Sequence, residues 1–250
     1  KGKDMQRILV TGGTGGIGTA ICKQLHDDGY QVVAGYYAGG KHEKAQAWQA
    51  KLSSEGYDIA LGFGNITSWE SCEACIDNIR KDFGTVDILI NNGGITRDTT
   101  LKKMTPDMWH DVIATNLTSV FYMTRLVIND MLEKKWGRII NISSVNAEKG
   151  QFGQANYSAA KAGMHGFTKA VAQEVAAKGI TVNTVSPGYI ATSMIMDVPE
   201  EVRNQILKGI PVGRFGKPEE IANVISFLAG ENSGFVTGSN ISANGGQHMS

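Results

Sequence analysis

Short runs of apolar residues alternate along the whole chain with longer stretches whose apolar positions recur at helical spacing. The short runs are rich in Ile, Val and Leu with little polar alternation, which is typical of strands covered on both faces. We expect strands at Arg7–Thr11, Gln31–Tyr36, Asp58–Phe63, Val86–Asn91, Arg138–Ser143, Thr181–Ser186 and Ser239–Ala243.

The stretches between these runs predict helices, several of which begin at a proline or end at a glycine. Their ranges are Gly16–Asp28, Lys41–Ser54, Trp69–Phe83, Pro106–Glu133, Asn156–Lys178 and Pro218–Gly230. Strict alternation of strand and helix predicts an α/β fold, with one parallel sheet covered by helices on both faces. No linker or repeat divides the chain, so residues 1–250 are expected to form a single domain, with residues 1–4 a non-native remnant.

Composition narrows the possible functions. The chain has 250 residues, with 24 Lys and Arg against 24 Asp and Glu, so it offers nucleic acids and anionic membranes no general attraction. We expect neither as a partner. No run of apolar residues is long enough to span a membrane, and the N-terminus lacks the apolar stretch of a secretory signal. These features predict a cytoplasmic protein.

The cysteines and histidines do not predict a metal site. Cys22, Cys72 and Cys75 are too few for a disulfide scaffold. The pair at 72 and 75 lies in a predicted helix and has no second pair of ligands. The five histidines are scattered along the chain.

A glycine-rich turn joins the first strand to the first helix. Glycine permits a tight turn there and lets the backbone approach a pyrophosphate, which the free N–H groups of the helix start then bind. A merely structural turn is the alternative. The predicted cofactor-binding residues of this turn are Gly12, Gly13, Thr14, Gly15, Gly16, Ile17 and Gly18.

The end of the second strand indicates which dinucleotide binds. It contains Gly35 but no Asp or Glu to hold a ribose 2′-hydroxyl, and Lys41 and His42 follow shortly. This pattern favours NADP over NAD, with Gly35 and Lys41 in the cofactor site. An ordinary solvated lysine is the alternative for Lys41.

Three polar residues form a candidate reactive group. Ser144 follows the fifth predicted strand, and Tyr157 and Lys161 are four apart, so they share one face of a helix. A lysine ammonium beside a tyrosine lowers the pKa of the phenol. We therefore expect Tyr157 to exchange protons and Ser144 to hydrogen-bond a substrate carbonyl.

With these motifs in this order, the chain resembles the short-chain dehydrogenase/reductase superfamily over essentially its whole length. The resemblance implies a seven-stranded, doubly wound Rossmann sheet and hydride transfer with a nicotinamide. It implies a catalytic set of Asn116, Ser144, Tyr157 and Lys161. In that set Tyr157 is the acid, Lys161 holds the nicotinamide ribose, and Asn116 supports a proton-relaying water.

The resemblance adds further cofactor residues to the glycine turn. They are Asn65, Ile66, Asn92, Gly93, Gly94, Pro187, Gly188, Tyr189 and Ile190, together with Tyr157 and Lys161. Two positions depart from the family pattern. Gly93 replaces the usual alanine, which removes a methyl group beside the cofactor, and Asn65 replaces a common aspartate of the adenine pocket.

Within the superfamily the chain is most similar to reductases of acetoacetyl-CoA in polyhydroxybutyrate synthesis. That likeness implies NADPH-dependent reduction of a short 3-ketoacyl-CoA to the (R)-3-hydroxyacyl-CoA by a homotetramer. The candidate substrate residues are Asp98, Ser144, Gln151, Phe152, Gln154 and Tyr189. For Phe152 the alternative is a loop aromatic covering the core, and for Asp98 it is a solvated loop acid.

Other functions stay open at this point. A 3-oxoacyl-acyl-carrier-protein reductase shares most of these motifs, although few basic residues beyond Arg97, Lys102 and Lys103 would meet an acidic carrier. A nucleotide-binding regulator that has lost catalysis is a third possibility, which the intact catalytic set argues against. The segment Met194–Gly213 is expected to cover the substrate, with a dimer contact or plain core as alternatives.

Overall fold

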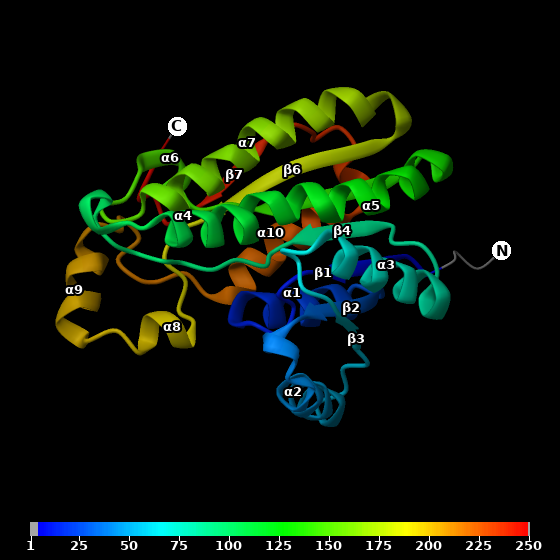
Figure 1. Cartoon of the computed structure of the whole chain (residues 1–250), viewed down its shortest axis with the longest axis horizontal. Helices are drawn as coiled ribbons and strands as arrows, with labels where there is room; N and C mark the ends of the chain where they lie inside the picture. The colour runs from blue at the N-terminus through cyan, green and yellow to red at the C-terminus, as the bar shows by residue number, and fades with distance from the viewer. Residues whose placement is uncertain (1–4, 250) are drawn as a thin grey trace.

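The computed structural model describes residues 5–249, so the proposed remnant at residues 1–4 lies outside the described part (Figure 1). Seven strands form one parallel sheet, as predicted, and their order in the sheet is β3-β2-β1-β4-β5-β6-β7. The strands are β1 Arg7–Val10, β2 Gln31–Tyr36, β3 Ala60–Phe63, β4 Ile88–Asn91, β5 Gly137–Ile142, β6 Ile180–Pro187 and β7 Asn240–Ala243.

Helices connect the strands and cover both faces of the sheet. They are α1 Gly16–Asp27, α2 His42–Ser54, α3 Trp69–Phe83, α4 Pro106–Ile113, α5 Ser119–Lys134, α6 Val145–Lys149, α7 Ala155–Val175, α8 Ser193–Met196, α9 Glu200–Lys208 and α10 Pro218–Ala229. Short 3₁₀ turns lie at Ala38–Gly40, Leu101–Lys103, Ala176–Lys178 and Glu231–Ser233, and a π-helical turn at Ala114–Thr118.

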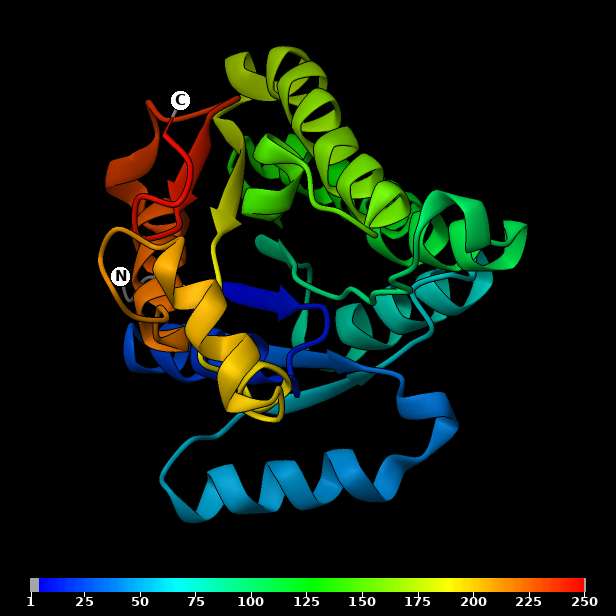
Figure 2. The ribbon, with the colours of Figure 1, turned by 90° about the vertical axis from the view of Figure 1, so that its left-hand side faces the viewer.

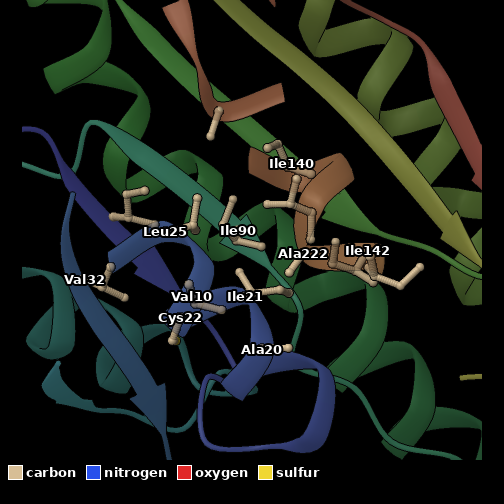
Figure 3. Packing of buried hydrophobic residues seen from close by; sticks show 14 of the residues in the cluster. Val10, Ala20, Ile21, Cys22, Leu25, Val32, Ile90, Ile140, Ile142 and Ala222 are labelled. Carbon is tan, nitrogen blue, oxygen red and sulfur yellow. The ribbon is translucent and has the colours of Figure 1, made fainter. Parts of the chain in front are cut away.

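Two hydrophobic clusters sandwich the sheet. On one face, side chains of α1 and α10 such as Ile21 and Ala222 pack against strand residues such as Val10 and Ile140 (Figure 3). On the other face, α3, α5 and α7 contribute the second cluster. Because the strands are buried on both sides, they read as nearly continuous apolar runs, which is why the sequence pattern located them.

Some helices differ from the prediction in where they begin, end or are interrupted. The stretch predicted as one helix from Pro106 to Glu133 is interrupted by the π-helical turn, which carries the buried Asn116. The segment Met194–Gly213 contains α9 and all of α8 except its first residue, and α9 has no buried residue, so this segment is not plain core. Helix α6 is only five residues long and carries too little periodicity to be recognised.

The strand order reverses between β1 and β4, which creates a crevice at their carboxyl ends. The Thr11 hydroxyl accepts hydrogen bonds from the backbone N–H of Asn92 and of Gly93, both at 3.0 Å, and so joins the two strand ends. Helices α8 and α9, in gold, stand at this carboxyl edge (Figure 2). Any ligand-binding chemistry of the fold is therefore expected at this edge.

In the part of the chain that the structure describes, no helix is both long and apolar enough to cross a membrane.

Two glycine-to-alanine substitutions in helices should change stability in opposite directions. A Cβ on Gly18 would overlap the carbonyl oxygen of Gly12 and lie 2.9 Å from Gly13 Cα, so Gly18→Ala forces the turn apart. We expect it to lower the free energy of unfolding by about 1–3 kcal/mol.

The control for that substitution is Gly166→Ala in α7. A Cβ at Gly166 meets no atom of the described residues within 4 Å, so alanine should raise the free energy of unfolding by roughly 0.5–1 kcal/mol. Urea unfolding of both variants measures the difference. Equal effects of the two substitutions would contradict the proposed crowding at Gly18.

Candidate active site

A cleft of about 960 Å³ opens at the carboxyl edge of the sheet, where the sequence motifs converge. The predicted residues Gly12, Thr14, Gly15, Gly16, Ile17, Gly18, Gly35, Asn65, Ile66, Asn92, Gly93, Gly94, Ser144, Tyr157, Lys161, Pro187 and Gly188 line it. The structure thus brings together most of the predicted cofactor site and three of the four predicted catalytic residues. Gly13, Asn116 and several substrate candidates lie outside this lining.

The floor of the cleft is formed by the backbone of glycine residues, which leaves room for a dinucleotide to approach closely. Gly12 has a positive φ of 61°, and a Cβ there would lie 2.9 Å from Gly93 Cα. Gly13 lies below the turn, where its N–H bonds the Gly35 carbonyl at 2.9 Å. The start of α1 follows directly, and N–H groups at a helix start bind phosphates. The residues present therefore fit a nicotinamide dinucleotide.

Gly93, where the family usually has alanine, is matched by the shape of its surroundings. A Cβ on Gly93 would lie 2.7 Å from Cδ1 of Ile66, so the isoleucine fills the space of the missing methyl group. The Gly93 N–H is also held by Thr11. This strand end is therefore packed and tethered although the methyl group is missing.

Asn65 lies at the predicted adenine end of the cleft. Its Oδ1 accepts hydrogen bonds from the backbone N–H and the hydroxyl of Thr67, at 3.1 and 2.8 Å. Those bonds fix the amide orientation and leave Nδ2 as the donor that can face a base.

At the end of β2, aromatic side chains surround the position expected to hold a 2′-phosphate. Tyr36 and Tyr37 line the cleft, and the Tyr36 hydroxyl lies 2.7 Å from Nδ1 of His42. The His42 ring also packs on Phe63, with 4.7 Å between centroids. Lys41 is exposed just before α2 and does not line the cleft.

Ser144 and Tyr157 meet in the cleft. Ser144 caps α6, and its Oγ accepts a hydrogen bond from the Asn146 N–H at 3.1 Å. Burial raises the pKa of Tyr157, while the hydrogen bond from Ser144 lowers it and the charge of Asp98 raises it further. The net direction is upward, so the predicted lowering of this pKa does not occur in the protein alone.

Lys161 is a buried ammonium below Tyr157. Its Nζ donates to the Ile142 carbonyl at 2.7 Å and lies 5.8 Å from the centroid of the Tyr157 ring. Burial lowers the pKa of Lys161 to about 8. At neutral pH the lysine therefore stays charged, but its distance from the ring is too great to outweigh the burial of the tyrosine.

Asn116 lies behind the lysine and is fully buried. Its Oδ1 accepts from the Ile95 N–H at 2.8 Å, and its Nδ2 donates to the Ile95 carbonyl at 2.9 Å. A Cβ on Gly94 would lie 3.3 Å from Asn116 Oδ1 and 3.5 Å from Lys161 Nζ. The side chain therefore holds the segment after β4 close to the lysine, and a side chain at position 94 would crowd Asn116.

The predicted substrate residues do not all gather in one place. Gln154 donates through Nε2 to Asp98 at 2.9 Å, which joins those two side chains. Gln151 accepts from Lys149 at 2.7 Å, and Phe152 is 87% exposed, so the alternative of a core-covering aromatic is wrong. Neither Gln151 nor Phe152 lines the cleft.

Tyr189 and Ile190 line a neighbouring cavity of about 280 Å³, which shares Gly188 with the cleft. Burial raises the pKa of Tyr189, and the charge of Asp98 adds to that shift. Tyr189 therefore lies close enough to Asp98 to feel its charge, although Tyr189 does not line the main cleft.

Three residues near the site were not predicted. Thr11 tethers β4, Asn146 lies between Ser144 and Tyr189, and Asn156 fixes the start of α7. Asn156 is fully buried and donates to the carbonyls of Arg97 and Met108. The one sequence feature that could have pointed to these three residues is their position, because each lies one or two residues from a predicted site residue.

The three cysteines are free and buried. Burial raises the pKa of Cys72 to about 12 and that of Cys75 to about 11, so both thiols are protonated at neutral pH. Among the described residues, no group of three His, Cys, Asp or Glu side chains could hold a metal ion.

Comparison with known proteins gives consistent matches over nearly the full chain. Residues 12–248 match the family described as enoyl-(acyl carrier protein) reductase. The chain is 54% identical over 245 residues to an acetoacetyl-CoA reductase of Cupriavidus necator, covering 98% of this chain and 99% of that protein.

Two further relatives show the spread of similarity. The chain is 53% identical to an acetoacetyl-CoA reductase of Allochromatium vinosum, over 98% of this chain and all of that protein. It is 44% identical to a 3-oxoacyl-acyl-carrier-protein reductase of Haemophilus influenzae, over 97% of this chain and 98% of that protein.

The burial of Lys161 should reduce stability in a pH-dependent way. Its pKa of about 8 in the folded chain is below the ordinary 10.5, so between these values only the unfolded chain binds the proton. The free energy of unfolding therefore rises with pH across this window, and the full cost of burying the charge is present below pH 8. Lys161→Met should be more stable than the parent at pH 7 by about 1–3 kcal/mol, after allowance for the unpaired Ile142 carbonyl.

Urea unfolding at pH 7 and pH 9.5, at one protein concentration, tests this expectation. The gap between Lys161→Met and the parent should shrink at the higher pH. Lys169→Met, at an exposed position of the same helix, serves as the control. A variant that is less stable than the parent at pH 7, or a gap that does not change with pH, would contradict the assignment.

Proposed function

The chain belongs to the short-chain dehydrogenase/reductase family, and we propose that it reduces acetoacetyl-CoA and other short 3-ketoacyl-CoA thioesters with NADPH. The product is the (R)-3-hydroxyacyl-CoA, which feeds polyhydroxybutyrate synthesis. The observation that carries the proposal is the convergence of Ser144, Tyr157 and Lys161 in one cleft with a glycine floor.

Family membership makes the chain an oxidoreductase. When bound, the reduced nicotinamide supplies the hydride, and the residues of the chain position the reactants and supply the proton. The glycine turn after β1 and the segment Asn92–Gly94 hold the dinucleotide. Lys161, anchored on the Ile142 carbonyl, is available to the ribose hydroxyls.

Tyr157 is the general acid, and Ser144 orients the ketone. Both hydroxyls face the same part of the cleft, because Ser144 hydrogen-bonds Tyr157. Tyr157 keeps its proton at neutral pH, since burial raises its pKa, and it can give that proton to the developing alkoxide oxygen because the alkoxide is the stronger base. Asn116 acts by holding the segment at Ile95 and supports a proton-relaying water.

The preference for NADPH is supported by the end of β2. Gly35 is followed by Tyr36 and Tyr37 in the cleft wall, without an acidic side chain to repel a 2′-phosphate. Lys41 lies at the adjoining start of α2, where its exposed side chain can supply a positive charge to that phosphate.

The choice of thioester rests on the relatives and on the substrate residues. The acetoacetyl-CoA reductases compared share more identity with the chain than the carrier-protein reductase does, at 47–54% against 44%. Asp98, Gln151, Phe152, Gln154 and Tyr189 form the proposed substrate side. The exposed Phe152 would cover the acyl chain once a substrate is bound, together with α8 and α9.

We also propose that the enzyme works in the cytoplasm as a homotetramer, with no nucleic-acid or membrane partner. Its three unpaired cysteines fit a reducing compartment. Phe121, Phe227 and Phe235 are 48%, 53% and 103% exposed in the single chain, and apolar side chains in such positions support subunit interfaces.

The proposed reaction predicts loss of reduced-nicotinamide absorbance with acetoacetyl-CoA as substrate. We expect fast loss with NADPH and slow loss with NADH, measured side by side. A preference for NADH would overturn the cofactor assignment and leave the reductase standing. Activity on an acyl-carrier-protein thioester alone would instead support the carrier-protein reductase.

The control for this assay is Tyr157→Phe, which keeps the ring and removes the proton donor. We expect its turnover to fall by roughly 10²- to 10⁴-fold, because a positioned acid contributes about that much. Full turnover by this variant would contradict the proposed mechanism.

The proposed assembly predicts a sedimentation mass near four times the 26.8 kDa of one chain. Phe121→Asp and Phe235→Asp should each lower the average mass, because a charge in an apolar interface is costly. The exposed Lys51→Asp in α2 is the control. A parent protein that sediments at 26.8 kDa would contradict the tetramer.

A further inference from the structure

Asn146 occupies a position in the site that the proposed mechanism does not use. Its side chain is buried, with 7% of the residue exposed, and it lies two residues after Ser144. Its backbone N–H donates to Ser144 Oγ at 3.1 Å. Its side chain also lies against the Tyr189 hydroxyl, where it opposes the rise in pKa that burial causes. Asn146 therefore stands between a catalytic hydroxyl and a proposed substrate residue.

A chain of hydrogen bonds fixes the orientation of the Asn146 amide. Asn146 Nδ2 donates to Gln154 Oε1 at 2.9 Å, and Gln154 Nε2 donates to Asp98 Oδ2 at 2.9 Å. An ionised carboxylate can only accept hydrogen bonds. Gln154 must therefore point its NH₂ group at Asp98 and its oxygen at Asn146. Asn146 in turn must donate a hydrogen bond to that oxygen through its own NH₂ group. We call these three side chains the amide relay.

The relay leaves the side-chain oxygen of Asn146 without a donor. Oδ1 is buried and makes no hydrogen bond to any residue that the structure describes. Buried polar atoms in proteins are nearly always paired, and leaving one unpaired is costly. Rotating the amide by half a turn would point its oxygen at the oxygen of Gln154, so the protein cannot relieve the cost in that way. The arrangement leaves a buried hydrogen-bond acceptor without a donor on a residue whose backbone N–H bonds Ser144.

The chemistry of the proposed substrate supplies a matching donor. In a 3-ketoacyl thioester the ketone, the thioester oxygen and the sulfur only accept hydrogen bonds. The first strong donor is the N–H of the pantetheine amide, two methylene groups beyond the sulfur. Ser144 caps α6 and its Oγ accepts from the Asn146 N–H at 3.1 Å, so the Asn146 side chain starts within one helical turn of the hydroxyl that orients the ketone.

We propose that Asn146 is a specificity-determining residue whose side-chain oxygen accepts the N–H of the first pantetheine amide. This inference rests on the proposed reduction of 3-ketoacyl thioesters. It assigns Asp98 and Gln154 a positioning role, since they fix the polarity of the Asn146 amide. The site then distinguishes pantetheine thioesters from other 3-keto esters by a hydrogen bond that only the former can make.

Two small thioesters that differ in this N–H test the inference. One is the N-acetylcysteamine thioester of acetoacetate, which carries the amide, and the other is its S-ethyl thioester, which does not. We expect the parent enzyme to prefer the amide-bearing thioester in kcat/KM. Asn146→Leu keeps the branching and the number of heavy atoms but removes the acceptor together with the donor to Gln154, and should lower kcat/KM for the amide-bearing thioester by roughly 3- to 10-fold.

The loss should appear in KM and spare kcat, because the amide lies away from the reacting carbon. On the S-ethyl thioester, Asn146→Leu should stay within about twofold of the parent. Asp98→Asn provides a second variant. It keeps the shape of the side chain, but an amide at position 98 can donate as well as accept, so it no longer fixes the orientation of the Gln154 and Asn146 amides. The preference for the amide-bearing thioester should therefore fall.

The matched control is Ser158→Ala. The Ser158 hydroxyl is a second buried polar atom without a partner among the described residues, close to Tyr157 in sequence but outside the relay. This variant should keep the parent preference between the two thioesters. An equal change with Ser158→Ala would mean that repacking near Tyr157, and not the acceptor, sets the preference.

The outcomes separate this inference from the proposed function. If the parent reduces neither thioester nor acetoacetyl-CoA, the proposed function fails. A second outcome is that the parent reduces both thioesters while Asn146→Leu and Asp98→Asn keep the parent's preference for the amide-bearing one. In that case solvent hydrogen-bonds Oδ1, and only the further inference is overturned. A loss that is equal on both thioesters would show a purely structural role and would also overturn it.

Discussion

The site depends on one constraint, which is that the ends of β1 and β4 approach each other with no side chain between them. Gly12 and Gly93 meet backbone to backbone, and a Cβ on Gly12 would lie 2.9 Å from Gly93 Cα. The Thr11 hydroxyl holds this approach by accepting hydrogen bonds from two successive N–H groups. Because the strand order reverses here, the approach defines the crevice in which a dinucleotide fits. Ser144 and Lys161 can act on a substrate only because they line the same cleft as this glycine floor.

Around that floor, polar groups are buried and held by backbone atoms. The Lys161 ammonium is anchored on the Ile142 carbonyl, and both polar atoms of the Asn116 side chain are used on Ile95. Backbone partners do not change rotamer, so these groups keep their places without side-chain entropy being lost again on binding. The arrangement reduces stability, because a charge is kept in a dry place, and it gains preorganisation for proton transfer. The amide relay applies the same logic to substrate recognition.

Much of the fold and site could be predicted from local pattern. The strands were located because burial on both faces makes them continuous apolar runs, and most of the glycine-turn residues line the cleft as expected. The π-helical turn that carries Asn116 was missed because its five residues continue the periodicity of the helices on either side. Helix α6 was missed because it is a single short turn capped by Ser144. Asn146 was passed over because nothing local distinguishes it from any other loop asparagine.

The sequence by itself determined the order of strands and helices, the glycine turn, and which reactive residues follow which strand. These features depend on neighbours within a few positions, where hydrophobic period and backbone freedom act. Only the tertiary structure decided the direction of the Tyr157 pKa, the tight fit of Ile66 beside Gly93, and the exposure of Phe152. It also decided the polarity of the relay, whose Gln154 and Asp98 are 56 residues apart. Burial and hydrogen-bond direction depend on which distant segments meet, and spacing along a single chain does not contain that information.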